Sequence, residues 1–467
     1  MSNALQRDLE RLVTRIERED GPRAASDPCR LKFHLMPPVG WLNDPNGLCR
    51  CGDWYHVFYQ YGPFDVTGGV KHWGHYRSRD LLHWEAMPVM LYPDQPWDIH
   101  GVYSGSALVE DGTLYLYYTG NVKHAGDYDY IKAGRGHNTA MAVSRDGVTV
   151  ESNTLLMENK DYPAGLTCHV RDPKVWAQDG KYYMVQGART LDDNGEVLLF
   201  ESTDKYHWTF LQALKTPKHF GYMWECPDLF CLDGQWFLVC SPQGVPHEET
   251  KFQNVYSCGY FPLYGDFRGE YSLGEFVELD LGFDFYAPQT FQDGDRRLMI
   301  GWMGIPDADY QNPTTQHGWQ HCLTVPCELR RQGDRLLRLP AVEMTALRGA
   351  AISPEQAKVF DLEAYTQPSG RMVFRDAAVL EWQPGLVTLS FLQGGAGRTV
   401  RRVALDQLHT LRVLGDSSSL EIFLNDGLQV LSTRYYPQTD ACGIALTGAD
   451  ARVWEMERMQ VTKAETV

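Results

Sequence analysis

The sequence predicts an all-β protein: a five-bladed β-propeller followed by a C-terminal β-sandwich, with a short N-terminal helix. Three observations predict this fold: a turn motif that recurs five times, an aromatic-rich run after each copy, and a change of composition near residue 340. Strand and turn signals that repeat every ~60 residues are typical of propeller blades. The expected units are an N-terminal helix over 1–28, a propeller over 29–339, a linker over 340–355 and a sandwich over 356–467.

A short turn motif, mostly of the Asp-Pro type, recurs five times in the first two thirds of the chain. A Gly-containing turn and an aromatic-rich alternating run follow each copy. The copies span 44–48, 104–108, 172–176, 226–230 and 287–291, and the runs span 52–59, 112–117, 180–185, 234–239 and 294–302. Radial repetition brings equivalent positions to one central axis. We therefore expect the carboxyl groups of Asp44, Asp172 and Glu225 to meet there.

The last third of the chain predicts a second β domain. Aromatic residues thin out around 335–350, and charges alternate with Leu, which is typical of a linker. Short strands are then expected over 371–374, 386–391, 411–414, 420–424 and 428–431. Asn425-Asp426-Gly427 is a strong hairpin signal between the last two. Closely spaced strands with polar turns favour a β-sandwich.

The bulk composition excludes several classes of partner. The chain of 467 residues is 43% hydrophobic, 12% aromatic and 22% charged, which is ordinary for a globular protein. A formal net charge of −17 argues against nucleic acid or an anionic membrane as the partner. A neutral small molecule is expected instead, because an anionic substrate needs a local basic cluster. No run of about 18 apolar residues is present, so no membrane span is expected. The oligomeric state is not predicted.

The N-terminal segment and the cysteines favour a cytoplasmic protein. Residues 1–20 lack the apolar core of a signal peptide and predict an amphipathic helix that packs on the domain surface. Its expected apolar face consists of Leu5, Leu9, Leu12, Val13 and Ile16. The 11 cysteines are odd in number, irregularly spaced and without a Cys-x-x-Cys pair, which is typical of buried, reduced thiols.

The three expected axial acids suit glycosidic bond hydrolysis, which needs one protonated and one ionised carboxyl group beside the bond. Pro45 fixes the turn after Asp44, so this side chain can project into the channel. Bulky apolar neighbours flank Glu225, and such surroundings favour the protonated form that a general acid needs. Arg171 should keep Asp172 ionised, which suits binding of sugar hydroxyls or stabilisation of positive charge.

A purely structural role accounts less well for the three acids. A single Asp before Pro is more often part of a turn than of a catalytic site. Three acids at equivalent positions of a repeat favour a functional site, because functional residues concentrate on the loops of propellers. The chain has no Gly-x-Ser-x-Gly elbow, no Gly-x-x-x-x-Gly-Lys phosphate loop and no His-Glu-x-x-His zinc helix.

At these residues the chain resembles glycoside hydrolase family thirty-two, which comprises invertases, β-fructofuranosidases and sucrose-6-phosphate hydrolases. Three motifs carry the resemblance, at 41–47, 171–173 and 224–227. Supporting matches lie at 58–61, 72–75, 103–106 and 300–303. The likeness runs from about Phe33 to the C-terminus.

The resemblance implies a propeller plus sandwich and a retaining double displacement at a fructosyl C2 atom. It implies that Asp44 is the nucleophile, Glu225 the acid/base, and Asp172 the group that holds fructosyl hydroxyls and stabilises the transition state. No metal or organic cofactor is implied. The substrate-binding positions that it implies are Trp41, Asn43, Gln60, Trp73, Tyr103, Ser104, Arg171 and Trp302.

One segment departs from the family pattern. Many members have Trp-Gly-Pro-Met before the His-Trp-Gly-His motif, whereas this chain has Gly-Gly-Val-Lys at 68–71. A stacking wall of the pocket is therefore expected to be absent or supplied from elsewhere, which affects the choice of leaving group. Lys71, next to the site, could contact an anionic group of a ligand, but we expect it to be a solvated lysine.

Three functions remain open on the sequence. The leading one is a β-fructofuranosidase acting on sucrose, its phosphate or short fructo-oligosaccharides. The others are a fructosyltransferase and a non-catalytic carbohydrate-binding propeller. The sandwich could stabilise the propeller, bind sugar or form an oligomer contact.

Overall fold

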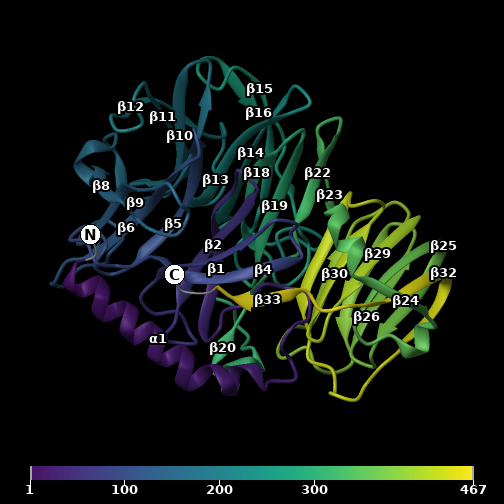
Figure 1. The fold of residues 1–467 in the computed structure, drawn as a ribbon. Coiled ribbons are helices and arrows are strands. Elements are labelled where there is room, and N and C mark those ends of the chain that lie inside the picture. The colour runs from purple at the N-terminus through teal and green to yellow at the C-terminus, as the bar shows by residue number, and fades with distance from the viewer. Residues whose placement is uncertain (1–2, 465–467) are drawn as a thin grey trace.

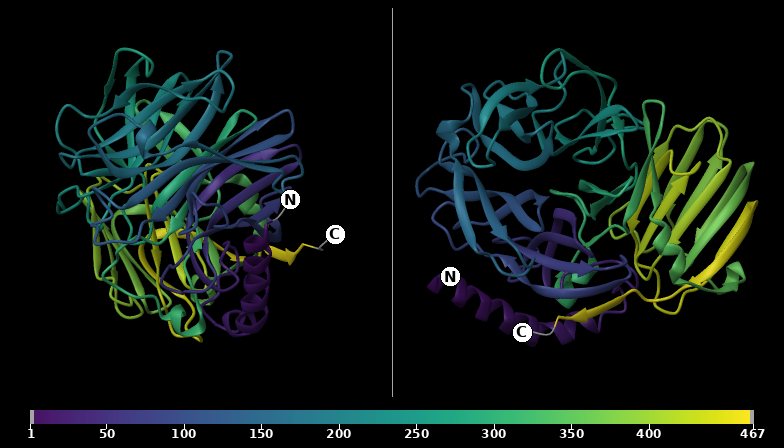
Figure 2. Two further views of the ribbon diagram at one scale, coloured as in Figure 1. Left: turned by 90° about the vertical axis from the view of Figure 1, so that its left-hand side faces the viewer. Right: turned by 45° about the horizontal axis from the view of Figure 1, so that its top comes forward.

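Strands dominate the computed structural model, which describes residues 3–464 (Figure 1). Five sheets built mainly from residues 40–340 surround a central axis, and the strands of residues 348–456 form a second body beside them (Figures 1 and 2). One long helix, α1 (Ala4–Ala25), lies along the outside of the ring. The all-β class, the propeller, the C-terminal sandwich and the N-terminal helix are thus confirmed.

The five blades follow one another along the chain, and each is a mainly antiparallel sheet. The first has β1 (Gly40–Cys51), β2 (Trp54–Gly62), β3 (His72–Ser78) and β4 (His83–Leu91), and the second has β5 (Val102–Glu110), β6 (Thr113–Lys123), β7 (Arg135–Ser144) and β8 (Ser152–Met157). The third has β9 (Leu166–Gln178), β10 (Lys181–Thr190), β11 (Gly195–Ser202) and β12 (Thr209–Leu214). The fourth has β13 (Met223–Leu232), β14 (Gln235–Gln243), β15 (Gly259–Gly265), β16 (Tyr271–Leu273) and β17 (Val277–Glu278). The fifth has β18 (Tyr286–Asp293), β19 (Arg296–Met303), β21 (Cys322–Leu323), β22 (Cys327–Gln332) and β23 (Arg335–Pro340).

The first strand of each blade lines the axis. Strands β1, β5, β9, β13 and β18 contact one another in circular order, and β18 returns to β1. A short strand, β20 (Trp319–Gln320), adds in parallel to β1 and so ties a late segment of the chain to the first blade. The aromatic runs expected from the sequence form the second strands, where their side chains pack between neighbouring blades.

The recurring motif is a β-bulge inside each axial strand, not the turn that the sequence suggested. In all five blades the pairing register slips at the motif, for example between Glu225 and Asp228. The backbone is left-handed at Asp172 (φ 63°), Cys226 (φ 46°) and Ala287 (φ 47°). A bulge leaves a residue outside the hydrogen-bond ladder, which is where a strand tolerates Pro. Two successive side chains can then face the axis, whereas a regular strand would alternate them.

The sandwich is built around two long strands, β25 (Phe360–Phe374) and β32 (Ile444–Met456), which pair with each other. The first half of β25 also pairs with β29 and its second half with β26, so β25 takes part in both layers. The other strands are β24 (Arg348–Ile352), β26 (Ala378–Gln383), β27 (Leu386–Phe391), β28 (Val400–Val403), β29 (Thr410–Gly415), β30 (Ser419–Leu424) and β31 (Gln429–Arg434). The five strands expected here are confirmed, and left-handed Asn425 and Asp426 form the expected β30–β31 turn.

The two ends of the chain cover the first blade. In α1, Asn3 caps the helix by accepting a hydrogen bond from the backbone of Gln6 at 2.8 Å. Val13 is buried, but Leu5 and Leu12 are 39% and 42% exposed, so the packed face is narrower than the expected stripe. The last strand, β33 (Gln460–Lys463), returns from the sandwich and pairs in parallel with β4 (Figure 2). Short 3₁₀ turns lie at Asn159–Asp161, Pro313–His317, Val342–Leu347 and Pro354–Gln356.

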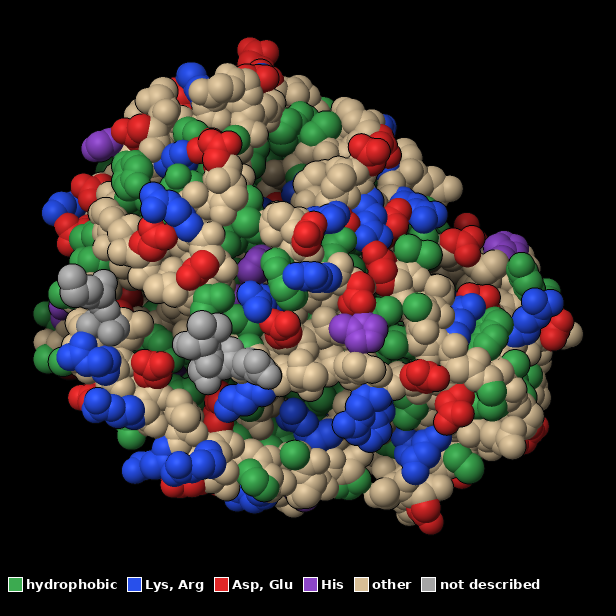
Figure 3. Space-filling model, viewed as in Figure 1, with side chains coloured by type: hydrophobic (Ala, Val, Ile, Leu, Met, Phe, Trp, Pro, Cys, Tyr) green, Lys and Arg blue, Asp and Glu red, His purple; other side chains and the backbone are tan. Residues whose placement is uncertain are grey.

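Acidic and basic side chains are interspersed over the face of the molecule seen in Figure 3.

All eleven cysteines are free thiols. Within residues 3–464, no helix has the length and apolar character needed to cross a membrane.

Candidate active site

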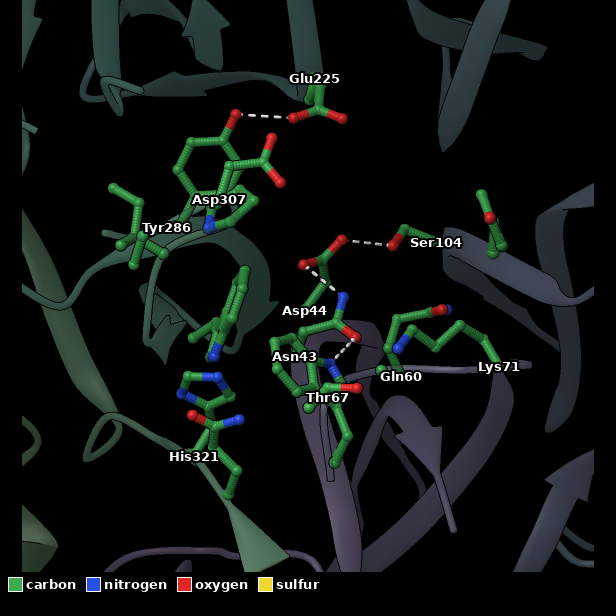
Figure 4. Close-up of a pocket in the computed structure, with 18 of the residues that line it drawn as sticks. Asn43, Asp44, Gln60, Thr67, Lys71, Ser104, Glu225, Tyr286, Asp307 and His321 are labelled. Atoms are coloured by element: carbon green, nitrogen blue, oxygen red, sulfur yellow. Dashed lines mark hydrogen bonds between the residues drawn. The ribbon is translucent and has the colours of Figure 1, made fainter. Parts of the chain in front are cut away.

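A pocket of about 600 Å³ lies where the bulged axial strands converge (Figure 4). Pairs of successive residues on these strands line it, as the bulges allow. Asp44 and Glu225, 181 positions apart in the sequence, both point into this one cavity (Figure 4). The lining residues from the axial strands are Trp41, Asn43, Asp44, Tyr103, Ser104, His169, Arg171, Asp172, Glu225 and Tyr286.

The Asp44 carboxylate is held by short polar contacts. Ser104 Oγ donates to Oδ2 at 2.5 Å, and Asn43 Nδ2 donates to Oδ1 at 2.9 Å. Cys226 Sγ lies 3.6 Å from Oδ2. Burial raises the pKa of Asp44 and Glu225 adds to this, while the hydrogen bonds from Ser104 and Asn43 lower it. These contacts fix the orientation of the carboxylate at the floor of the cavity.

The Glu225 carboxyl group is surrounded by hydrogen-bond donors. Arg171 Nε donates to Oε1 at 3.1 Å, and Gln243 Nε2 and Tyr286 Oη donate to Oε2 at 2.8 and 2.6 Å. The expectation of apolar surroundings for Glu225 is therefore wrong, because this carboxyl group lies among polar side chains. Its neighbour Trp224 is fully buried and packs in another direction, against Phe261.

Asp172 differs from the expectation that Arg171 keeps it ionised. Arg171 turns toward Glu225, and its Nε lies 3.9 Å from Asp172 Oδ2. Burial raises the pKa of Asp172 to about 7; Arg171 opposes this, and Glu225 and Asp44 reinforce it. The backbone N–H of Cys226 donates to Oδ2 at 2.9 Å and orients the group. Near neutral pH Asp172 can therefore hold a proton and donate a hydrogen bond to a ligand.

Seven of the eight expected substrate-binding residues line the pocket: Trp41, Asn43, Gln60, Tyr103, Ser104, Arg171 and Trp302. Trp302 is buried, and its indole N–H has no partner among the described residues. Trp41 donates to Asn43 Oδ1 at 2.7 Å and so positions the amide that contacts Asp44.

Trp73 is the exception. It does not line the pocket but is completely buried between the first two blades, with Phe58 and Tyr118 nearby. Its indole N–H donates to the backbone oxygen of Tyr103 at 3.0 Å. Trp73 lies on β3, two strands out from the axis, so it can support the pocket only through Tyr103.

Sequence reasoning missed several lining residues. Tyr286 immediately precedes the fifth motif copy, at the same bulge position as Arg171 and Glu225, so the repeat itself could have identified it. No repeat signal marks the others. His169 lies on the axial strand β9, and the rest come from second strands, blade edges and the 305–312 loop. The residues missed in this way include Lys71, Arg135, His169, Gln243, Asp307, Tyr310, Asn312 and His321.

Lys71 is half-buried in the pocket wall, not the solvated lysine expected from the sequence. Its Nζ lies 4.9 Å from the centroid of the Trp41 ring. A Cβ added at Gly68 would stand only 3.3 Å from the same Nζ, so the absence of a side chain at 68 makes room for the lysine. Burial lowers the pKa of Lys71 to about 7, although Asp44 and Asp65 oppose the shift.

We predict that Lys71→Met stabilises the fold at low pH. The unfolded chain keeps this amine protonated up to about pH 10, whereas the folded chain releases its proton near pH 7. Stability therefore rises with pH across this window, and the full cost of the buried charge is present below it. In urea denaturation, the variant should gain about 1–2 kcal/mol at pH 6, allowing for an amine that faces an open pocket, and less at pH 9.5. Exposed Lys132→Met is the control, and an equal gain there would contradict the prediction.

No group of three or more His, Cys, Asp or Glu side chains in the described part of the chain is arranged to hold a metal ion. The chemistry open to the pocket itself is that of its acids: one carboxylate fixed by hydroxyl and amide donors, one carboxyl group bonded to Arg, Gln and Tyr, and a third that titrates near neutrality. Such a set can supply a nucleophile and an acid/base on one substrate.

Comparison with known proteins gives consistent matches over most of the chain. The profile of the glycosyl hydrolases family 32 N-terminal domain matches residues 34–340, and that of the family 32 C-terminal domain matches residues 387–463. A sucrose-6-phosphate hydrolase of Bacillus subtilis (strain 168) is 40% identical over 454 residues, covering 91% of this chain and 93% of that protein. One of Klebsiella pneumoniae is 39% identical, covering 89% and 90%.

Solved structures of related proteins superpose over nearly the full length. A sucrose-6-phosphate hydrolase from Lactobacillus gasseri has a TM-score of 0.87 at 28% identity, covering 96% of this chain and 97% of that one. A Bombyx mori β-fructofuranosidase mutant in complex with sucrose has a TM-score of 0.83 at 28% identity, covering 99% and 100%.

Proposed function

This chain belongs to glycosyl hydrolase family 32, and from its pocket we propose that it is a β-fructofuranosidase that cleaves terminal β-D-fructofuranosides by a retaining mechanism. Sucrose, sucrose 6-phosphate and short fructo-oligosaccharides are the candidate substrates. The single observation that carries the proposal is the convergence of Asp44 and Glu225 on one cavity from different blades.

In the first step, Asp44 attacks the fructosyl C2 atom while Glu225 gives its proton to the glycosidic oxygen. The C2–oxygen bond breaks, the leaving sugar departs with the proton, and an ester forms between C2 and the Asp44 carboxylate. The Ser104 and Asn43 hydrogen bonds aim the attacking carboxylate. Tyr286 and Gln243 hold the other acid at the opposite side of the bond.

In the second step, Glu225 acts as the base. It takes a proton from a water molecule that attacks C2, and the C2–Asp44 bond breaks to return the free carboxylate. Two inversions at C2 give net retention. Arg171, which contacts Glu225 from the same wall, offers the positive charge that stabilises this group when it is ionised.

Asp172 and the tryptophans bind the fructosyl ring. Asp172 is oriented by the Cys226 backbone and faces the same cavity as both acids, which suits hydrogen bonds to the ring hydroxyls. Trp41 and Trp302 line the same pocket and can pack against the ring. As positive charge develops on the ring, its hydroxyls become stronger donors, so their hydrogen bonds to Asp172 can tighten when this group is ionised; only interactions that strengthen in the transition state accelerate the reaction.

A substrate panel tests the proposed function. Purified protein is incubated with sucrose, sucrose 6-phosphate, kestose and inulin, and released fructose is measured enzymatically. We expect fructose to be released from the small fructosides. At high sucrose concentration, we expect that no oligosaccharides longer than the substrate form. Oligomer formation would instead indicate a fructosyltransferase. Sugar binding without any turnover would identify a non-catalytic binding protein and overturn the proposal.

We further propose that the protein works in the cytoplasm. The free thiols support this, because oxidising compartments favour disulfides. Localisation of the tagged full-length chain by cell fractionation tests it.

A further inference from the structure

One amine lines the pocket without a polar partner in the protein. Lys71 Nζ lies 4.9 Å from the centroid of the Trp41 ring, on the wall of the cavity. Among residues 3–464 this amine has no hydrogen-bond acceptor and no ion-pair partner. A charged group taken out of water without such a partner is unfavourable, and burial accordingly lowers its pKa. The packing of the fold therefore does not explain why a lysine stands here.

The local sequence makes room for this amine. Positions 68 and 71 are Gly and Lys, where the family pattern has Trp and Met. A Cβ at Gly68 would stand 3.3 Å from Lys71 Nζ, and the backbone there (φ 134°) is one that residues with a side chain rarely adopt. The chain has thus exchanged an apolar part of the pocket wall for a hydrogen-bond donor.

A chain of contacts places Lys71 on the far side of the nucleophile from the acid. From Trp41, beneath the amine, a hydrogen bond of 2.7 Å leads to Asn43, and one of 2.9 Å leads from Asn43 to Asp44. Glu225, by contrast, is bonded by residues of the third, fourth and fifth blades. Figure 4 shows Lys71 with Asp44 between it and Glu225. The amine therefore lies at the end of the pocket remote from the acid.

The neighbouring donors at this end of the pocket already bond the protein. Gln60 Nε2 and Gln320 Nε2 donate to backbone oxygens at 3.0 and 2.7 Å. The indole N–H of Trp41 is used within the pocket floor. A protonated lysine carries three N–H groups, and those of Lys71 face the cavity without an acceptor. A ligand oxygen placed here would satisfy at least one of them.

The position of the amine identifies the part of the substrate that it would contact, and this step rests on the proposed function. Asp44 bonds the fructosyl C2 atom and Glu225 protonates the glycosidic oxygen, so the leaving sugar lies on the Glu225 side. The C1 hydroxymethyl group and the glycosidic oxygen are both attached to C2. The C6 hydroxymethyl group is attached to C5, across the ring oxygen. The C6 end is therefore the part of the fructosyl unit that reaches away from the acid, toward Lys71.

We propose that Lys71 is a specificity-determining residue that donates a hydrogen bond to the C6 hydroxyl oxygen of the terminal fructosyl unit. The bond gives the amine the acceptor that the protein does not provide, so a sugar without this oxygen leaves the amine unpaired. A site that bonds a substrate hydroxyl rejects the analogue that lacks it. The preferred substrates are then fructosides whose fructosyl unit carries an oxygen at C6.

The test combines one change in the protein with one change in the substrate. We compare kcat/KM for sucrose and for 6′-deoxysucrose, which has hydrogen in place of the fructosyl C6 hydroxyl, at pH 6. The wild type should prefer sucrose about 10- to 100-fold, the range for a hydrogen bond to a charged group. Lys71→Met keeps the length of the side chain without its N–H groups, so this preference should fall to about threefold or less. Exposed Lys132→Met, outside the pocket, is the matched control and should keep the wild-type preference.

Two further comparisons separate the possible failures. The preference for sucrose over 1′-deoxysucrose should be the same in the wild type and Lys71→Met. Calorimetric binding of sucrose and 6′-deoxysucrose to Asp44→Asn, with and without Lys71→Met, should show the same pattern without turnover. An equal preference for sucrose over 6′-deoxysucrose in the wild type and Lys71→Met, or an effect on the C1 hydroxyl instead, would overturn the role of Lys71. Absence of fructose release from every substrate by the wild type would instead refute the proposed function.

Discussion

Asp44→Asn is expected to lower kcat for fructose release by about 10⁴-fold or more, because an amide cannot form the ester with C2. The side chain keeps its size, so the pocket should still bind sugar. Ser104 can still donate to the remaining amide oxygen. Initial rates of fructose formation from sucrose and sucrose 6-phosphate, with substrate binding followed by calorimetry, measure both effects.

The matched control for this variant is Asp111→Asn. Asp111 is exposed in the β5–β6 turn and has a left-handed backbone (φ 49°), which Asn also tolerates. This control should keep wild-type rates. If Asp44→Asn kept more than about a hundredth of the wild-type kcat, Asp44 would not be the nucleophile.

Arg398→Met is expected to destabilise the protein by about 3–5 kcal/mol, because it leaves a buried carboxylate without its partner. Arg398, in the sandwich, bonds both carboxylate oxygens of Asp284 in the propeller at 2.7 Å. Both side chains are completely buried. Burial alone would raise the pKa of Asp284, but Arg398 holds it below its usual value. Thermal and urea denaturation at pH 7 measure the loss.

The dependence of stability on pH provides a second test of this prediction. A carboxyl group with a lowered pKa stabilises the fold above its unfolded value, about 3.9, and this stability is lost as pH falls through the folded value. Without Arg398, the pKa of Asp284 should rise, so the variant should begin to lose stability at a higher pH than the wild type. Arg371→Met is the control, since Arg371 forms an exposed pair with Glu381. Equal losses in the two variants would refute the prediction.

The same residue indicates what the sandwich does. Arg398 also donates to Asn312 Oδ1 at 2.8 Å and stacks over Tyr310 at 4.0 Å, and both of these residues line the pocket. We infer that the sandwich stabilises the propeller and supports the 305–312 loop. Of the roles left open by the sequence, these contacts favour the stabilising one.

Much of the fold follows from the sequence because a propeller repeats its local signals. The five motif copies and the aromatic runs predict the blades, and closure of the ring brings Asp44, Asp172 and Glu225 together. The late hairpin at Asn425 is equally local. Helix α1 was expected, but not the exposure of Leu5 and Leu12, since periodicity does not say how much of a face is covered.

The contacts between blades could not be predicted in this way. Arg171 precedes Asp172 in sequence but bonds Glu225. The neighbouring blade places Glu225 Oε1 3.1 Å from Arg171 Nε, whereas Asp172 Oδ2 lies 3.9 Å from the same atom. Lys71 enters the pocket because Gly68 has no side chain. Trp73 belongs to a matching motif, yet its strand lies away from the axis.

The central claim, that Asp44 and Glu225 act on the same C2 atom, is tested most directly by trapping the intermediate. Glu225→Ala is mixed with β-D-fructofuranosyl fluoride, whose leaving group needs no acid, so the ester should form and then hydrolyse slowly without its base. After acid quenching and proteolysis, mass spectrometry should find one fructosyl unit on the peptide that contains Asp44. A fructosyl unit on a different residue, or release of fructose with no covalent adduct at any time, would contradict the account.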